Sequence, residues 1–222
     1  MKRILVVLAL TGLAAVGFAQ SSKQTASIST VSLQSCVISS VDCPGTWTSL
    51  VPTLTMQTSN ATSLFVNVST VVGLYTSTKV TGNNTGATST ATATAGVHVR
   101  VLLDGTVYAF PDATGSGIDF DNRVQTLTAN LGNIFTSACA PGSTTTCTLT
   151  PEQITLILNT SRAHDFNFVL LNVGSGSHTI DIQVLADAHS TADTGGVAIA
   201  GAAYGPASVT IEAVRLVHGF SF

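Results

Sequence analysis

The chain has 222 residues, of which 45% are apolar and only 9% are charged, and its formal net charge is −3. This length suits a single sandwich- or barrel-sized domain, and the high apolar content excludes a disordered chain. Because there is no excess of basic residues, we expect neither nucleic acid nor an anionic membrane surface as a partner.

The first 19 residues have the pattern of a secretory signal peptide. Met1-Lys2-Arg3 precedes an apolar run over residues 4–16, which ends in the small-residue exit Gly17-Phe18-Ala19. This pattern predicts cleavage after Ala19. The run is short for a bilayer span and no second one follows, so we expect no transmembrane segment in the mature chain. The prediction is an exported protein (periplasmic, cell-surface or extracellular) in which residues 20–222 form one domain.

The first half of the mature chain contains segments with the pattern of β-strands. Residues 31–37, 50–56 and 63–72 are rich in β-formers, and 63–72 concentrates its aliphatic residues at alternate positions. The Thr-Ala-rich stretch 81–95 suits either a loop or a flat strand. The clearest element is a hairpin of 97–103 with 106–110. Its Asp104-Gly105 turn indicates type I′, because Asp and Gly both tolerate positive φ.

The second half predicts a further hairpin, of 165–173 with 178–185, and a last strand over 208–217. Within 178–185, Ile180, Ile182 and Val184 alternate with polar residues, which is typical of a half-buried antiparallel strand.

One segment departs from the strand pattern. Thr150-Pro151-Glu152-Gln153 has a capping-box arrangement with Pro at the first helical position, and apolar residues recur after it at helical spacing. We therefore predict a short helix over 151–160, with a strand as the alternative. The expected fold is all-β: a single antiparallel β-sandwich, jelly-roll or immunoglobulin-like, with this one short helix.

The four cysteines form two close pairs in the sequence, Cys36 with Cys43 and Cys139 with Cys147. An exported chain with an even number of cysteines usually oxidises them. Three connectivities are possible, and the short spacings favour two local disulfides. A zinc site is disfavoured because the pairs lack the C-x2-C spacing of a zinc knuckle.

An acidic cluster beside a glycine-rich loop is the candidate metal site. Its members are Asp112, Asp119, Asp121 and Asn122. Oxygen ligands on loops suit calcium, and no other cofactor is indicated. Aspartates in loops more commonly stabilise turns, and the calcium-loop spacings are missing, so turn stabilisation is the interpretation we favour.

No catalytic motif is present in the sequence. The five histidines include no H-E-x-x-H, and no G-x-S-x-G occurs. Asp181 and Glu212 are the carboxylates available for a glycosidase pair, but their patterns place both on solvated sheet faces. We expect a non-enzymatic secreted or cell-envelope protein with an adhesion, glycan-binding or surface-structural role, whose partner is a glycan or another envelope protein.

Two alternatives to this function stay open at this stage. One is a secreted carbohydrate-active hydrolase. The other is a small outer-membrane β-barrel, which the terminal Phe220 and Phe222 suggest and the scarcity of Trp and Tyr disfavours.

Overall fold

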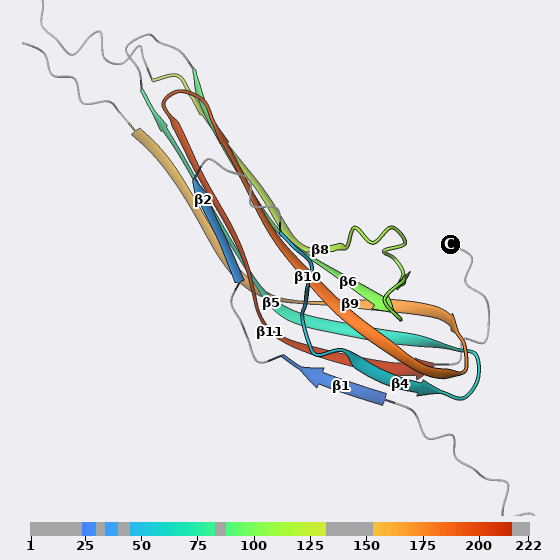
Figure 1. The fold of residues 1–222 in the computed structure, drawn as a ribbon. Coiled ribbons are helices and arrows are strands. Elements are labelled where there is room, and N and C mark those ends of the chain that lie inside the picture. The colour runs from blue at the N-terminus through green and yellow to red at the C-terminus, as the bar shows by residue number, and fades with distance from the viewer. Residues whose placement is uncertain (1–23, 30–33, 40–44, 83–87, 132–152, 215–222) are drawn as a thin grey trace, which may run out of the picture.

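The computed structural model describes residues 24–29, 34–39, 45–82, 88–131 and 153–214, and all regular structure in these ranges is β-strand (Figure 1). For residues 24 and 34–39 only the backbone is described. None of these ranges contains a helix that is long and apolar enough to cross a membrane. The strands are β1 (Gln24–Ile28), β2 (Gln34–Ser39), β3 (Thr48–Ser49), β4 (Leu54–Thr58), β5 (Thr62–Thr81), β6 (Ser89–Leu103), β7 (Val107–Tyr108), β8 (Ile118–Ala129), β9 (Gln153–Val173), β10 (Gly176–Ala192) and β11 (Gly196–Val214).

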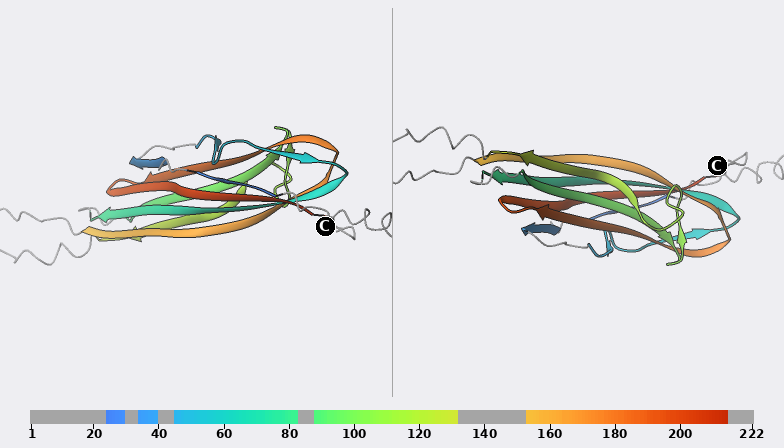
Figure 2. Two further views of the ribbon diagram at one scale, coloured as in Figure 1. Left: turned by 90° about the horizontal axis from the view of Figure 1, so that it is seen from below. Right: turned by 90° about the horizontal axis from the view of Figure 1, so that it is seen from above.

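The strands form two antiparallel sheets, which lie face to face as two layers (Figure 2). In sheet A, β1 and β2 both pair with β11, β11 pairs with β5, and β5 pairs with the edge strand β9. In sheet B, β3 and β4 both pair with β10, β10 pairs with β6, and β6 pairs on its other side with β7 and β8. The predicted antiparallel β-sandwich is confirmed.

The order of pairing identifies the sandwich as a jelly roll. The strands pair from the outside of the chain inwards: β1 and β2 with β11, β3 and β4 with β10, β5 with β9, and β6 with β7 and β8. Successive pairs fall alternately in sheet A and sheet B, as in a long hairpin rolled up on itself. This order matches the jelly-roll alternative and not the immunoglobulin one.

The core lies between the sheets and follows the alternation of the strands. Every even-numbered residue of β5 from Leu64 to Val80 is buried. The Thr-Ala stretch of β6 is a strand from Ser89, with its alanines inside and its threonines outside. Thr90 and Thr92 meet Thr128 and Thr126 of β8 through side-chain hydrogen bonds of 3.3 and 3.1 Å. Around the first part of β6, the core is thus filled by the small side chains of Ala91, Ala93 and Ala95. Elsewhere it is filled by larger aliphatic side chains and by phenylalanines such as Phe168.

The hairpin around Asp104-Gly105 is confirmed, with a second strand of Val107–Tyr108 where the sequence predicted 106–110. Asp104 and Gly105 both have positive φ, 51° and 71°, and the Thr106 amide donates to the Leu103 carbonyl at 3.1 Å. The strands pair Leu103 with Val107, so Thr106 also belongs to the loop. The loop has three residues where the sequence predicted two.

The predicted helix over 151–160 is wrong for its described part. Gln153 to Thr160 are the first residues of β9, and they pair with β5 over their whole length. Apolar residues at 154, 156 and 158 also have the period of a strand, and β5 needs a hydrogen-bonding partner along this edge. The need of β5 for a hydrogen-bonded neighbour outweighs the local signal for a helix start. Of that signal, Pro151 and Glu152 lie outside the described residues.

The second predicted hairpin is also wrong. The alternation within its two strands is confirmed, but β9 pairs with β5 in sheet A while β10 pairs with β4 and β6 in sheet B. The Gly174-Ser175 link therefore crosses from one sheet to the other. Because β9 and β10 lie in different sheets, each packs one face against the opposite sheet. An isolated hairpin of the two strands would leave both faces exposed.

Candidate functional site

A shallow groove with a volume of about 300 Å³ lies on the outer face of sheet A. Register places its residues side by side: Asn67 of β5 is opposite Asn167 of β9 and Thr210 of β11, and Phe65 is opposite Glu212. Three strands that are distant in the sequence thus supply one surface, which we call the Phe65 groove. Its lining residues are Phe65, Asn67, Asn167, Thr210, Glu212 and Val214.

A bulge in β11 turns three of these side chains outwards, those of Thr210, Glu212 and Val214. Ala198, Ala200 and Ala202 point inwards before it, and Val209 and Ile211 point inwards after it. The shift from even to odd numbers occurs between Tyr204 and Ala207, at Gly205-Pro206. Proline within a sheet is confined to edge strands, strand starts and bulges, and β11 is an internal strand. Without the extra residue, Thr210, Glu212 and Val214 would face the core.

The polar side of the groove is organised before any ligand binds. Asn67 Nδ2 donates to Asn167 Oδ1 at 3.0 Å. This bond leaves the Asn67 carbonyl as an acceptor, and it leaves one hydrogen of the Asn67 amide and both hydrogens of the Asn167 amide as donors. Thr210 adds a hydroxyl and Glu212 a carboxylate. The groove therefore offers donors and acceptors beside one aromatic ring, with the two amides held to each other.

A second aromatic residue lies in the same row of sheet A. Phe110 exchanges two backbone hydrogen bonds with Val169 of β9, at 2.9 and 3.0 Å, and Val169 is opposite Phe65. Residues paired in this way carry their side chains on the same face. The two phenylalanines, 36% and 37% exposed, are separated by two strand spacings, about 9.5 Å.

A different cluster, on the outer face of sheet B, holds a loop in place. The guanidinium carbon of Arg100 lies 4.2 Å from the centre of the Trp47 ring and 5.6 Å from that of Tyr108. Its Nε donates to Gln183 Oε1 at 2.8 Å and its Nη1 to the Gly115 carbonyl at 3.0 Å. Stacking on two rings and two hydrogen bonds fix this guanidinium, and with it the loop over 111–117.

Asp112 at the base of that loop is buried, with 4% exposure. Its carboxylate accepts hydrogen bonds from the backbone amides of Gly115 at 2.9 Å and Gly117 at 3.0 Å. A side chain at either glycine would strike an aromatic ring, because the added Cβ would lie 2.3 Å from Tyr108 and 2.5 Å from Trp47, respectively. Asp112 thus performs the turn stabilisation that the sequence analysis favoured.

His98 lies beside the Arg100 cluster, between two carboxylates. Its Nδ1 is 2.6 Å from Asp119 Oδ1 and its Nε2 is 3.1 Å from Asp187 Oδ1. The hydrogen bond to Asp187, followed by the charges of both aspartates, raises the pKa of His98 against the effect of burial. Because carboxylates only accept, both bonds form when the ring is an imidazolium. Gly96 leaves room for Asp187, whose Oδ1 would lie 2.7 Å from an added Cβ.

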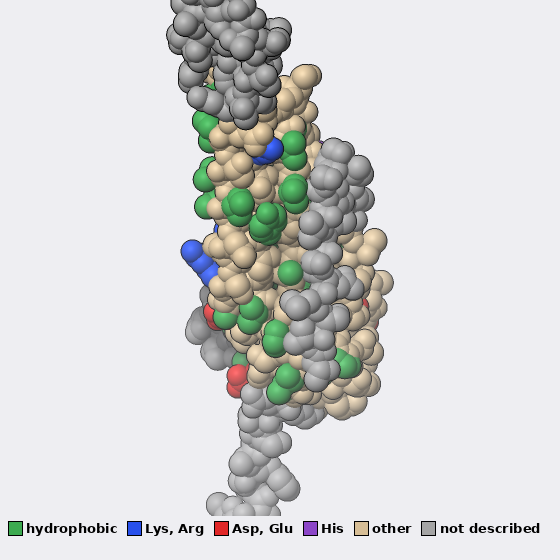
Figure 3. Space-filling view, turned by 90° about the vertical axis from the view of Figure 1, so that its left-hand side faces the viewer, with side chains coloured by type: hydrophobic (Ala, Val, Ile, Leu, Met, Phe, Trp, Pro, Cys, Tyr) green, Lys and Arg blue, Asp and Glu red, His purple; other side chains and the backbone are tan. Residues whose placement is uncertain are grey.

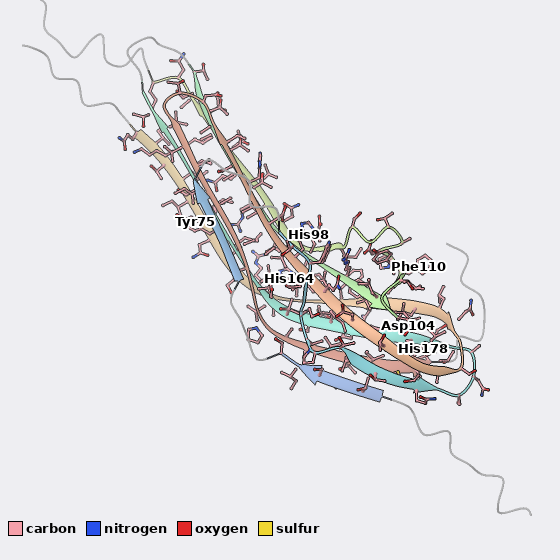
Figure 4. All side chains as sticks on the ribbon, in the orientation of Figure 1. Tyr75, His98, Asp104, Phe110, His164 and His178 are labelled. Atoms are coloured by element: carbon pink, nitrogen blue, oxygen red, sulfur yellow. The ribbon has the colours of Figure 1, made fainter. Side chains whose placement is uncertain are left out.

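A further histidine–aspartate pair fixes the hairpin turn (Figure 4). His178 Nδ1 lies 2.8 Å from Asp104 Oδ2, and the Thr179 amide donates to Asp104 Oδ1 at 2.8 Å. The bond to Asp104 raises the pKa of His178, and the same bond lowers the pKa of Asp104. The pair joins the β6–β7 turn to β10.

The structure separates the four calcium candidates. Asp112 is bonded to its own loop, Asp119 to His98, and Asp121 Oδ2 lies 3.7 Å from His164 Nε2. Asn122 is exposed, opposite Gly96. In the part of the chain that the structure describes, no three His, Cys, Asp or Glu side chains are grouped to hold a metal ion. Calcium binding stays an untested alternative to the turn stabilisation that we favour.

The remaining sequence candidates have different outcomes. Asp181 lies on the outer face of sheet B, where Ser49 and Gln183 donate to it, and Glu212 lies on the outer face of sheet A. The two carboxylates are on opposite faces of the sandwich and do not form a glycosidase pair. Cys43, Cys139 and Cys147 lie outside the described residues and only the backbone of Cys36 is described, so the disulfides stay a prediction.

The sequence analysis missed the Phe65 groove, apart from Glu212. One signal was available, since Asn67 is the polar residue between Val66 and Val68 in a strongly alternating strand. Its partner Asn167 is a hundred residues away and is found only from the strand register.

No protein-family model matches the sequence, and no curated protein matches it. One solved structure, described as infectious bursal disease virus Gx strain, has 10% identity and a TM-score of 0.24, and the match covers 87% of this chain and 43% of that one. The structure of the Gt strain has 10% identity and a TM-score of 0.14, and the match covers 89% of this chain and 43% of that one. The chain thus spans less than half the length of either. The assignment of a jelly roll therefore rests on the strand order of this chain.

Proposed function

We propose that the chain is an exported, non-enzymatic binding module of the cell surface or envelope that recognises a neutral glycan at the Phe65 groove. The observation that carries this proposal is the pairing of an exposed phenylalanine ring with a preformed amide–amide hydrogen bond in one groove. Sugars present the same combination, with an apolar C–H face and a rim of hydroxyl groups that both donate and accept.

Each lining residue has a role in this proposal. The Phe65 ring packs against the apolar face of a sugar ring. The Asn67 carbonyl and the Asn167 amide bind neighbouring hydroxyls as acceptor and donor, and Glu212 accepts from a further hydroxyl. The six lining residues include one carboxylate and no basic group. An anionic sugar would meet like charge, which favours a neutral ligand.

The order of the strands gives the ligand a direction. The groove takes its lining from β9, β5 and β11, which lie side by side in sheet A. A linear glycan running across the strands contacts residues of all three strands with more than one sugar unit. We therefore expect oligosaccharides to bind more tightly than monosaccharides.

The experiment is a binding assay of the full chain against neutral cello-, chito-, manno- and xylo-oligosaccharides. We expect Phe65→Ala to weaken binding by about tenfold or more, because losing a large apolar contact costs about 1.5 kcal/mol. Tyr75→Ala is the matched control, since Tyr75 lies on the same face of the same strand, farther towards the other end of the sandwich (Figure 4). Equal binding by wild type and Phe65→Ala, or no binding to any of these glycans, would contradict the proposal.

A further inference from the structure

We propose that Asp104 is a site of spontaneous isomerisation to isoaspartate, through a succinimide formed with Gly105, and that His178 restrains this reaction. The inference concerns the turn between β6 and β7 and does not depend on glycan binding. It rests on the sequence of the turn, on the free amide of Gly105 and on the residues of β10 that hold the Asp104 carboxylate.

The turn has the sequence at which succinimides form most readily. Asp104 is the only aspartate of the chain that precedes a glycine, and no asparagine precedes one. Glycine has no Cβ that would hinder an approach to its backbone nitrogen. Asp104, Gly105 and Thr106 are all exposed, and an added Cβ at Gly105 would meet nothing within 4 Å. The turn therefore has room to change its backbone conformation during the reaction.

The backbone amide of Gly105 is available as the nucleophile. The Asp104 amide donates to the Thr179 carbonyl at 2.8 Å, and the Thr106 amide donates to the Leu103 carbonyl at 3.1 Å. The amide between them, that of Gly105, has no hydrogen-bond partner among the described residues. It is thus the amide of this loop that attacks without first breaking a hydrogen bond.

The reaction needs no partner other than water. The Gly105 nitrogen bonds to Cγ of Asp104, and the hydroxyl of the neutral carboxyl group leaves as water with the amide proton. Water then opens the succinimide ring. Cleavage between Cγ and nitrogen restores aspartate, whereas cleavage between nitrogen and the backbone carbonyl carbon gives isoaspartate. The main chain of the turn then contains one additional carbon, and the carboxylate no longer lies where β10 binds it.

Two residues of β10 hold the Asp104 carboxyl group in its unreactive form. His178 Nδ1 lies 2.8 Å from Oδ2, and Oδ1 accepts from the amide and the hydroxyl of Thr179 at 2.8 and 3.2 Å (Figure 4). Because both oxygens are bonded, rotation of the carboxyl group towards the Gly105 nitrogen is restricted. The bond to His178, followed by that to the Thr179 amide, lowers the pKa of Asp104. A lower pKa reduces the fraction of the neutral acid, which is the form that loses its hydroxyl.

His178 is the charged partner in this restraint. Its Nε2 lies 3.1 Å from the Gly174 carbonyl, so the imidazolium donates to an acceptor at each nitrogen. Charged side chains are sparse on this molecule, as Figure 3 shows for one side. In the part of the chain that the structure describes, His178 is the one charged group that pairs with Asp104. Its removal should therefore release the carboxyl group.

Peptide mapping of the full, folded chain after prolonged incubation at neutral pH tests the proposal. Isoaspartate leaves the mass unchanged and is recognised by its chromatographic elution and its fragment ions. We expect it at position 104. His178→Ala should accumulate it about two- to fivefold faster than the wild type, the factor that corresponds to the loss of an ion pair near the surface. His178→Asn should be slower than His178→Ala, because the asparagine amide takes the place of Nδ1 and still donates to the carboxylate.

Two further variants serve as controls. His98→Ala removes another histidine that is bonded to carboxylates on sheet B, but not to Asp104, and should leave the rate at position 104 unchanged. Gly105→Ala should slow the reaction, because its methyl group hinders the nitrogen. Equal rates in the wild type and His178→Ala, or no isoaspartate at position 104 in either, would overturn the proposal. So would an equal acceleration in His98→Ala, which would indicate general loosening of the fold.

Discussion

Two glycine-to-alanine substitutions separate the backbone preference of a turn from the close packing of a loop. Gly105 and Gly115 both have positive φ, 71° and 78°. A Cβ at Gly105 would meet nothing within 4 Å, whereas one at Gly115 would lie 2.3 Å from the Tyr108 ring. Gly105→Ala should therefore cost only the left-handed backbone penalty, about 1–2 kcal/mol.

Gly115→Ala carries the same backbone penalty and a further cost. To relieve the contact, either the Tyr108 ring moves or the loop lifts, and lifting breaks the bonds from Gly115 to Asp112 and from Arg100 to Gly115. Each bond involves a charged group and contributes about 1.5–3 kcal/mol. We expect Gly115→Ala to lower the free energy of unfolding by about 2 kcal/mol more than Gly105→Ala.

Urea denaturation of both variants and the wild type measures this difference. For a chain of this size, about 1 kcal/mol corresponds to a Tm change of about 2–4 °C, so thermal melts provide a second readout. Gly105→Asn serves as the control, because asparagine tolerates positive φ and should recover part of the loss seen with alanine. Equal losses for Gly105→Ala and Gly115→Ala would refute the reasoning that the loop rests on Tyr108.

Three further predictions concern protons, cysteines and calcium. The pKa of His98 is raised above its ordinary 6.5, so the stability from its two hydrogen bonds is complete below that pH and is lost as the pH rises through the raised value. His98→Asn should flatten this part of the stability–pH curve measured by denaturation, and an unchanged slope would argue against the assignment. Non-reducing peptide mapping of the exported protein should find the two local disulfides, and free thiols or a long-range pairing would exclude them. Calcium at about 100 times its dissociation constant would stabilise a protein with a calcium site by roughly 2.7 kcal/mol. Because three of the four candidate ligands have other partners, we expect turn stabilisation and no shift of Tm at millimolar calcium.

Local patterns in the sequence were sufficient for some of the strands and for one turn, but not for β8 or for the first residues of β9, which the sequence analysis assigned to a helix. Burial of Ile180, Ile182 and Val184 and the positive φ of Asp104 and Gly105 follow from alternation and turn chemistry, which depend on neighbouring residues only. The choice of partner strand does not. β9 and β10 are joined by a short link, yet each pairs with a strand far away in the sequence.

The site was harder to predict than the fold for the same reason. The Phe65 groove depends on the register of three strands and on one bulge, at Gly205-Pro206, that reverses which residues of β11 face outwards. A Gly-Pro pair inside an alternating segment is a recognisable bulge signal. Its effect on Glu212 becomes clear only once β11 is placed beside β5.

The most direct test of the proposed function is to observe the Asn67 and Asn167 side-chain amides by NMR during titration with a neutral oligosaccharide that the binding assay selects. These amides form the polar centre of the groove. If the ligand binds at the groove, the chemical shifts of their NH2 groups should change and saturate with the dissociation constant found in the binding assay. In Phe65→Ala the same changes should need more ligand. Saturable binding that leaves both amide signals unchanged would contradict the account and place the ligand elsewhere on the sandwich.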